Sequence, residues 1–174
     1  MTPAAPLHVV VMGVSGTGKS TVGALLAADL GVTLVEGDSY HPAANIAKMS
    51  SGTPLTDEDR MPWLRALAQV TRDRHAEGLS TVLTCSALRR CYRDVLREGV
   101  PGTESFFVHL HADFAVLERR MREREHFMPP SLLRSQFDTL EPLEDDERGV
   151  VVDVAAPLSE VMARARAALG VTAG

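Results

Sequence analysis

The chain has 174 residues, of which 45% are hydrophobic and 24% charged, and its net charge is −5, which fits one domain with a sizeable core. The negative charge, with no dense run of Lys or Arg, argues against a nucleic-acid-binding protein, because such proteins need positive charge facing the phosphates. No apolar run approaches the roughly 20 residues that span a bilayer, and two cysteines without a disulfide pattern favour a cytoplasmic protein.

Strands and helices are predicted to alternate along the chain. Short apolar runs indicate buried strands, and apolar residues three and four apart indicate helices. In chain order, the predicted elements are a strand at 8–12, a helix at 19–31, strands at 33–38 and 80–85, a helix at 86–99, a strand at 105–111, a helix at 112–125, a strand at 149–154 and a helix at 157–170. This order predicts an α/β sandwich, with a five-stranded, mostly parallel sheet between two layers of helices.

Two longer segments interrupt the alternation. The first, 39–78, carries helical patterns near 42–49 and 60–76, and the second is 124–148. Both segments are longer than an ordinary connection between neighbouring strands. In α/β proteins, ligands bind beyond the carboxyl ends of the strands, where such insertions can reach them. Within a single domain, 1–174, we interpret the first as an acceptor-binding insert and the second as a mobile lid. The alternative is that both are plain surface helices.

The loop after the first strand, GVSGTGKS at 13–20, matches the Walker A motif Gly-x-x-x-x-Gly-Lys-Ser in a strand-loop-helix context. Glycines let consecutive backbone N–H groups face an anion, and the helix N-terminus adds its positive dipole end. We expect Lys19 to reach the β- and γ-phosphates of ATP and Ser20 to bind Mg²⁺. The alternative is a glycine-rich turn. The predicted ATP-binding residues here are Gly13, Val14, Ser15, Gly16, Thr17, Gly18, Lys19, Ser20 and Thr21.

Two acidic residues, Glu36 and Asp38, end the second predicted strand. The chain has no Asn-Lys-x-Asp motif of a GTPase, and its third strand runs into Ser86 instead of the usual Walker B aspartate. A carboxylate at 36 or 38 is placed to hold Mg²⁺ through water or to accept a proton from an attacking hydroxyl. This favours phosphoryl transfer to a small alcohol, with Lys19 and Asp38 as catalytic residues, over a motor or a switch.

Several polar residues are predicted to reach an acceptor at this edge of the sheet. A residue before proline avoids the α-helical backbone conformation. Pro42 is therefore expected to keep His41 out of the following helix, at the entrance of the acceptor site. Arg60 and Lys48 offer positive partners for a carboxylate, while Trp63 is interpreted as core. The candidate substrate-binding residues are Asp38, His41, Lys48, Arg60, Ser86, Arg90, His126 and Gln136. For each, the alternative is a capping, ion-paired or solvated surface residue.

Arg120 and Arg124 lie on the helix that leads into the lid. Arginine there stacks on adenine or stabilises the charge of the transferring phosphoryl group, so both are predicted to bind ATP and Arg124 to be catalytic. The alternative is pairing with glutamates four residues away on the same helix.

Longer stretches resemble the gluconokinase family, which is related in fold to shikimate and nucleoside-monophosphate kinases. The stretches are MGVSGTGKST, EGDSYHPAANIAKMSSGTPLTDEDRMPWL, CSALRRCYRDVLREG and HFMPPSLLRSQFDTLEPL. The resemblance implies ATP-dependent phosphorylation of D-gluconate to 6-phospho-D-gluconate, with Mg²⁺, in a homodimer. The chain departs from the family at Glu36, which is commonly Asp, and at 124–127, one residue shorter than the family's Arg-Lys-Gly-His-Phe.

Two alternatives stay open from the residues themselves. One is a related kinase that acts on another sugar acid, a polyol or a nucleotide. The other is an ATP-sensing module that binds ATP without catalysing phosphoryl transfer. The candidate base Asp38 argues against the sensor, which does not need one.

Overall fold

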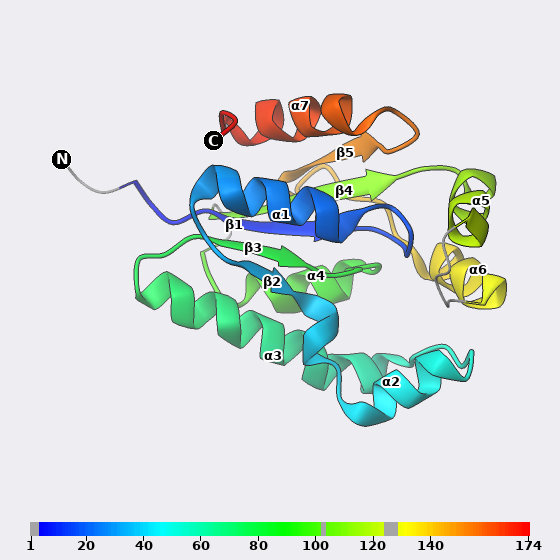
Figure 1. Cartoon of the computed structure of the whole chain (residues 1–174). Helices are drawn as coiled ribbons and strands as arrows, with labels where there is room; N and C mark the ends of the chain where they lie inside the picture. Colours follow the sequence, from blue (N-terminus) through cyan, green and yellow to red (C-terminus); the bar gives the residue numbers. More distant parts are fainter. Residues whose placement is uncertain (1–3, 102–103, 124–128) are drawn as a thin grey trace.

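The computed structural model describes residues 4–101, 104–123 and 129–174 (Figure 1). Its strands are β1 (His8–Met12), β2 (Leu34–Glu36), β3 (Thr81–Thr84), β4 (Ser105–His111) and β5 (Gly149–Asp153). They form one sheet in the order β2-β3-β1-β4-β5, and every neighbouring pair is parallel. The predicted α/β fold is therefore confirmed. All residues of β1 are buried, as expected for the central strand of a sheet covered on both faces.

Helices cover both faces of this sheet. Helices α1 (Lys19–Leu30) and α7 (Leu158–Leu169) lie on one face, and α3 (Asp57–Ala76) and α4 (Arg90–Arg97) lie on the other (Figure 1). The remaining helices, α2 (Ala43–Ser50), α5 (Phe114–Glu123) and α6 (Pro130–Thr139), gather beyond the carboxyl ends of the strands. No helix in the described ranges is long and apolar enough to cross a membrane.

Three boundaries and one whole helix differ from the prediction. Strand β2 ends at Glu36, before the predicted end at 38, because Gly37–Tyr40, which include Asp38, form a short 3₁₀ helix. Helix α4 begins at Arg90 instead of 86, because residues before it form a loop in which Ala87 adopts a φ of 47°. Helix α3 begins at Asp57, earlier than 60, because Thr56 and Asp59 form a reciprocal capping box. Helix α6 lies in the proposed lid, where no helix was predicted. It packs Leu132 and Leu133 into the protein.

A buried ion pair ties α4 to the loop before β5. The side chains of Arg93 and Glu147 are both 0% exposed, and Arg93 Nε donates to Glu147 Oε2 at 2.7 Å. Arg93 Nη1 also donates to the carbonyl of Ala87 at 2.9 Å, which holds the β3–α4 loop. Burial alone raises the pKa of Glu147, but hydrogen bonds from Arg93 and Arg97 outweigh it and lower the pKa to about 2.

The change Glu147→Gln should leave Arg93 buried without a counter-charge and lower the free energy of unfolding by about 3–5 kcal/mol at pH 7. The folded pKa of about 2 lies below the ordinary 4.5, so this stabilisation is complete above pH 4.5 and is lost as pH falls towards 2. Urea unfolding at pH 7, 4 and 3 should show the difference in the free energy of unfolding between the parent and Glu147→Gln becoming smaller as pH falls. Glu144→Gln, which breaks an exposed pair with Arg90, is the control and should cost about 1 kcal/mol or less. A difference in the free energy of unfolding that does not change with pH would contradict this explanation.

Candidate active site

The predicted phosphate loop joins β1 to α1 at the carboxyl end of the central strand. Its first residue, Gly13, has a φ of +140°, and a Cβ there would lie 2.4 Å from the carbonyl oxygen of Leu110. The N–H of Gly13 donates to the carbonyl of Ser86 at 3.2 Å. The loop is therefore seated between the ends of β4 and β3, in a turn that only glycine fits. Lys19, Ser20 and Thr21 form the first residues of α1, where N–H groups have no helical partner.

The ammonium group of Lys19 lies on the loop itself. Its Nζ donates to the carbonyls of Gly13 and Val14, each at 3.0 Å. Burial lowers the pKa of Lys19, and the charges of Asp38 and Glu36 act in the opposite direction. A partly desolvated cation of this kind is suited to phosphate oxygens, which offer stronger negative charge than backbone carbonyls.

Glu36 is held beside Ser20 by hydrogen bonds. Ser20 Oγ donates to Glu36 Oε2 at 3.1 Å, and Thr84 Oγ1 donates to the same oxygen at 2.7 Å. Thr84, which the sequence analysis did not single out, also accepts from the N–H of Gly37 at 3.1 Å. Hydroxyl and carboxylate oxygens are the ligands that Mg²⁺ prefers, so this set fits the ion expected at Ser20.

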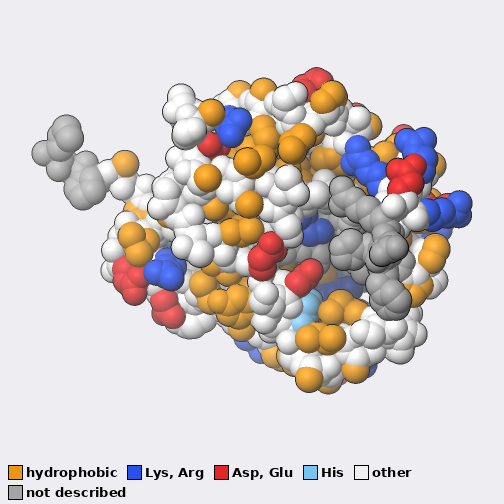
Figure 2. Space-filling view, viewed as in Figure 1, with side chains coloured by type: hydrophobic (Ala, Val, Ile, Leu, Met, Phe, Trp, Pro, Cys, Tyr) orange, Lys and Arg blue, Asp and Glu red, His pale blue; other side chains and the backbone are white. Residues whose placement is uncertain are grey.

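A cavity of about 230 Å³ lies in front of the phosphate loop, bounded by α2, α3 and α6. In Figure 2, acidic, basic and histidine side chains meet in the hollow above the α2 region. The cavity brings together the predicted residues Ser15, Lys19, Asp38, His41, Arg60, Ser86 and Gln136. The lining residues that the prediction missed are Ile46, Met49, Thr53, Pro54, Leu55, Trp63, Leu88, Leu132 and Ser135. Most of them are apolar, and an apolar residue in a helix or loop carries no sequence signal that separates a cavity wall from core packing.

One wall of the cavity is a stacked pair of rings. His41 and Trp63 have ring centroids 3.9 Å apart at an angle of 20°. Trp63 Nε1 donates to the carbonyl of Gly37 at 2.8 Å, so a residue predicted as core also positions the site. Burial lowers the pKa of His41, although the charge of Asp38 opposes this. Asp38 itself is 91% exposed in its side chain, with Oδ1 3.9 Å from His41 Nε2, and is open to a ligand.

Arg60 lies on the cavity wall beyond this pair. Its Nη1 donates to Tyr92 Oη at 2.8 Å, and its guanidinium lies 5.2 Å from the centre of the Tyr92 ring. Tyr92 Oη in turn donates to Asp57. Because a guanidinium has five N–H donors, the bond to Tyr92 fixes Arg60 and leaves donors for a carboxylate.

Gln136 contacts the phosphate loop directly. Its Oε1 accepts from the backbone N–H of Ser15 at 2.7 Å, which connects α6 of the predicted lid to the loop. The prediction placed Gln136 on the substrate. In this structure its amide oxygen instead accepts a hydrogen bond from the Ser15 N–H, a backbone group of the loop that is predicted to bind phosphate.

Several predicted residues do not line this cavity, and ion pairing explains two of them. Lys48 Nζ bonds Asp59 Oδ2 at 2.8 Å, and Arg90 bonds Asp94, Glu144 and Asp146 at 3.0, 2.5 and 2.7 Å. Arg120 Nη2 donates to the carbonyl of Val154, just after β5, at 2.5 Å. Arg124 and His126 lie outside the described residues.

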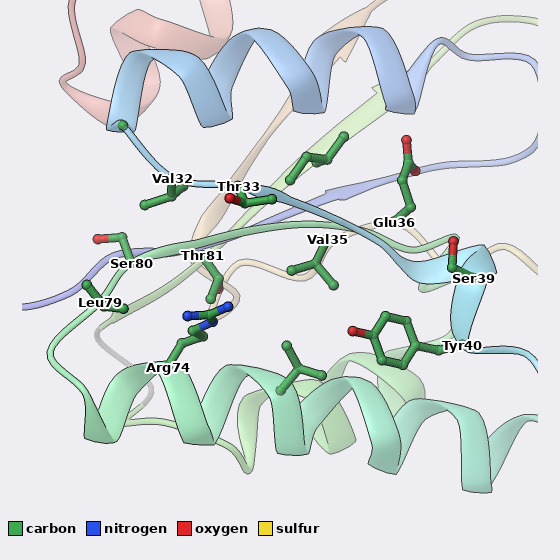
Figure 3. Close-up of a pocket in the computed structure, with 13 residues that line it drawn as sticks. Val32, Thr33, Val35, Glu36, Ser39, Tyr40, Arg74, Leu79, Ser80 and Thr81 are labelled. Atoms are coloured by element: carbon green, nitrogen blue, oxygen red, sulfur yellow. The ribbon is translucent and has the colours of Figure 1, made fainter.

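A second and larger cavity, of about 550 Å³, lies between β2 and α3. Figure 3 shows Tyr40 and Arg74 facing this space, while Glu36 points away towards α1. Glu36 is the one predicted site residue that lines it, and none of its lining residues belongs to the phosphate loop. Its position, away from the phosphate loop, sets it apart from the site described above.

Comparisons with known proteins agree with this arrangement. A family model described as an AAA domain matches residues 9–143. A gluconokinase of Gluconobacter oxydans is 52% identical over 143 residues, which cover 82% of this chain and 79% of that protein. A solved gluconokinase from Sinorhizobium meliloti superposes with a TM-score of 0.86 at 50% identity, covering 95% and 93% of the two chains. A sugar kinase from a Janibacter species superposes with a TM-score of 0.91, also at 50% identity, and covers 96% of each chain.

The change Gly13→Ala should destabilise the protein and abolish nucleotide binding, because its Cβ would collide with the backbone of β4. Gly31→Ala, at the end of α1 and outside the phosphate loop, is a matched control: its φ of +66° is also positive, but nothing lies within 4 Å of its Cβ position. The control should lower the free energy of unfolding by about 1–2 kcal/mol from backbone strain alone. Gly13→Ala should lower it clearly more. Thermal unfolding and titration with a fluorescent ATP analogue measure both effects. Equal losses in the two variants would show that the contact with Leu110 is unimportant.

Proposed function

The chain belongs to the gluconokinase family, and we infer that it transfers the γ-phosphoryl group of ATP to a hydroxyl of D-gluconate, giving ADP and 6-phospho-D-gluconate. The observation that carries this inference is the shared cavity in which Lys19 of the phosphate loop faces Asp38, His41 and Arg60. A phosphate donor and a small acceptor carrying a carboxylate and hydroxyls are the ligands that these groups recognise.

We propose that ATP binds with its phosphates on the N–H groups of loop 13–18 and on Lys19. Ser20 would hold Mg²⁺, with Glu36 or Asp38 contributing through water, and the bound ion would neutralise charge on the β- and γ-phosphates. Lys19 then exchanges the carbonyls of Gly13 and Val14 for phosphate oxygens.

We propose that D-gluconate binds with its carboxylate on Arg60 and its hydroxyl groups near His41 and Ser86. The reacting hydroxyl oxygen attacks the γ-phosphorus, the bond to the β–γ bridging oxygen breaks, and ADP leaves. Asp38 orients that hydroxyl and takes its proton. This assignment is supported by the exposure of Asp38, by the 3.9 Å between its Oδ1 and His41 Nε2, and by the cavity that it lines together with Lys19.

The lid role of 124–148 is also a proposal, supported by the contact of Gln136 with Ser15. In it, Arg124 and Arg120 contribute to ATP binding, with Arg124 acting on the transferring group, and His126 and Gln136 meet the substrate on closure. We also propose a homodimer in the cytoplasm. The family resemblance supports the dimer, and the free Cys85 and Cys91 support a reducing compartment.

The change Asp38→Asn keeps the shape of the side chain and removes its charge. We expect kcat for gluconate phosphorylation to fall at least about a hundredfold, since general-base help contributes roughly 10²–10⁴-fold. Affinity for an ATP analogue should change only a few-fold. A coupled ADP assay and an analogue titration on the same preparations measure both. A kcat within about threefold of the parent would remove Asp38 from the catalytic role.

The change Arg60→Gln should raise the KM for gluconate about 10- to 100-fold with a smaller effect on kcat, because a charged hydrogen bond to the carboxylate is lost. Arg89→Gln is the matched control. Arg89 pairs with Asp57, the carboxylate that also accepts from Tyr92, but does not line the cavity. Its KM should stay near that of the parent. A similar rise in both variants would indicate that the local ion pairs matter and that Arg60 does not bind the carboxylate.

A further inference from the structure

Three side chains of types that can bind a metal ion meet at the end of the sheet opposite the phosphate loop. They are His8 at the start of β1, His75 near the end of α3 and Glu104 just before β4. Their nearest ligand atoms all lie within 4.8 Å of one another. His8 Nε2 is 3.1 Å from His75 Nδ1, and His75 Nδ1 is 3.2 Å from Glu104 Oε2.

The hydrogen bond between His8 and Thr81 decides which atoms of the cluster can donate and which accept. His8 Nδ1 lies 2.9 Å from Thr81 Oγ1. When that nitrogen carries the proton and donates to Thr81, the Nε2 atom turns a lone pair towards the other two residues. Glu104 Oε2 is buried without a hydrogen-bond partner of good geometry, although it lies beside His75. A single proton on His75 Nδ1 cannot serve both His8 Nε2 and Glu104 Oε2, so one of these two acceptors is left without a donor from His75.

We propose that His8, His75 and Glu104 form a binding site for a divalent transition metal ion of the Zn²⁺ type. A tetrahedral Zn²⁺ with bonds of about 2.0–2.1 Å places neighbouring ligand atoms roughly 3.3 Å apart. His75 Nδ1 lies 3.1 Å from His8 Nε2 and 3.2 Å from Glu104 Oε2, and the ligand atoms of His8 and Glu104 lie within 4.8 Å of each other. Two imidazoles with one carboxylate favour Zn²⁺, Co²⁺ or Ni²⁺ over Mg²⁺ and Ca²⁺, which prefer oxygen ligands alone.

The surroundings of the site fit such an ion. The hydroxyl of Thr81 orients the His8 ring, as an outer partner commonly does for a histidine that binds a metal. His8 is 2% exposed, whereas the side chains of His75 and Glu104 are 29% and 21% exposed. An ion can therefore enter from solvent, and water can supply the fourth ligand.

The ion would have a structural role. It would connect β1, α3 and β4 at the amino ends of the strands, while the proposed reaction takes place at their carboxyl ends. The inference therefore does not depend on the proposed function. Because the metal binds the folded chain, it should raise the melting temperature without changing kcat for gluconate.

The test uses untagged, full-length protein, freed of metal with a chelator and dialysed. Calorimetry should show one equivalent of Zn²⁺ bound, and Co²⁺ should give the visible absorption bands of a four- or five-coordinate ion. At a hundredfold excess over its dissociation constant, Zn²⁺ should raise the melting temperature by about 5–10 °C. His75→Gln and Glu104→Gln should each weaken Zn²⁺ binding at least tenfold and abolish the Co²⁺ bands.

Glu77→Gln is the matched control, because it removes an exposed carboxylate two residues from His75 that pairs with Arg74. It should bind Zn²⁺ as the parent does. His75 and Glu104 are partly exposed, so their variants are expected to fold, and melting curves without metal verify this. The proposal is overturned if the parent binds no Zn²⁺, or if folded His75→Gln and Glu104→Gln variants bind it as tightly as the parent.

Discussion

The charge of Lys19 is the constraint around which the active site is arranged. A partly desolvated ammonium group is costly unless it is hydrogen-bonded and faces negative charge. Here the carbonyls of Gly13 and Val14 supply the hydrogen bonds, and Asp38 and Glu36 supply the charge. These partners are weaker than the triphosphate of ATP, so in the proposed complex the nucleotide would gain energy from a cation that is already in place. The same positive charge lets two carboxylates lie close to where the γ-phosphate is expected.

Backbone and side-chain contacts together hold the loop that carries Lys19 and the segments around it. The turn at Gly13 lies against Leu110 of β4 and is bonded to Ser86 after β3, so three strands contribute to one loop. The β3–α4 loop is held from behind by Arg93, whose buried partner Glu147 precedes β5. On the acceptor side, Trp63 bonds Gly37 and stacks on His41, which positions the segment that carries Asp38. The site is thus assembled from segments far apart in the chain.

The sequence predicted the features that depend on local pattern. Buried strands are continuous apolar runs, and the glycine spacing of the phosphate loop is readable without a structure. The start of α4 was not predictable from periodicity, because Ala87 adopts a positive φ where Arg93 bonds its carbonyl. Long-range contacts account for the other differences. Arg90 pairs with acidic residues more than 50 positions away, and Gln136 bonds Ser15 across 121 positions. No pattern of local spacing carries that information.

The most direct test of the central claim is the rate of ADP formation with Mg²⁺-ATP across a panel of acceptors, with the phosphorylated product identified by ³¹P NMR. The panel compares D-gluconate, D-sorbitol, AMP and no acceptor. A cavity lined by Lys19, Asp38 and Arg60 predicts rapid ADP formation with D-gluconate. It predicts much slower formation with sorbitol, which lacks the carboxylate, and none above background with AMP. ADP release that is equal with and without acceptor, or that is faster with AMP than with gluconate, would contradict the account.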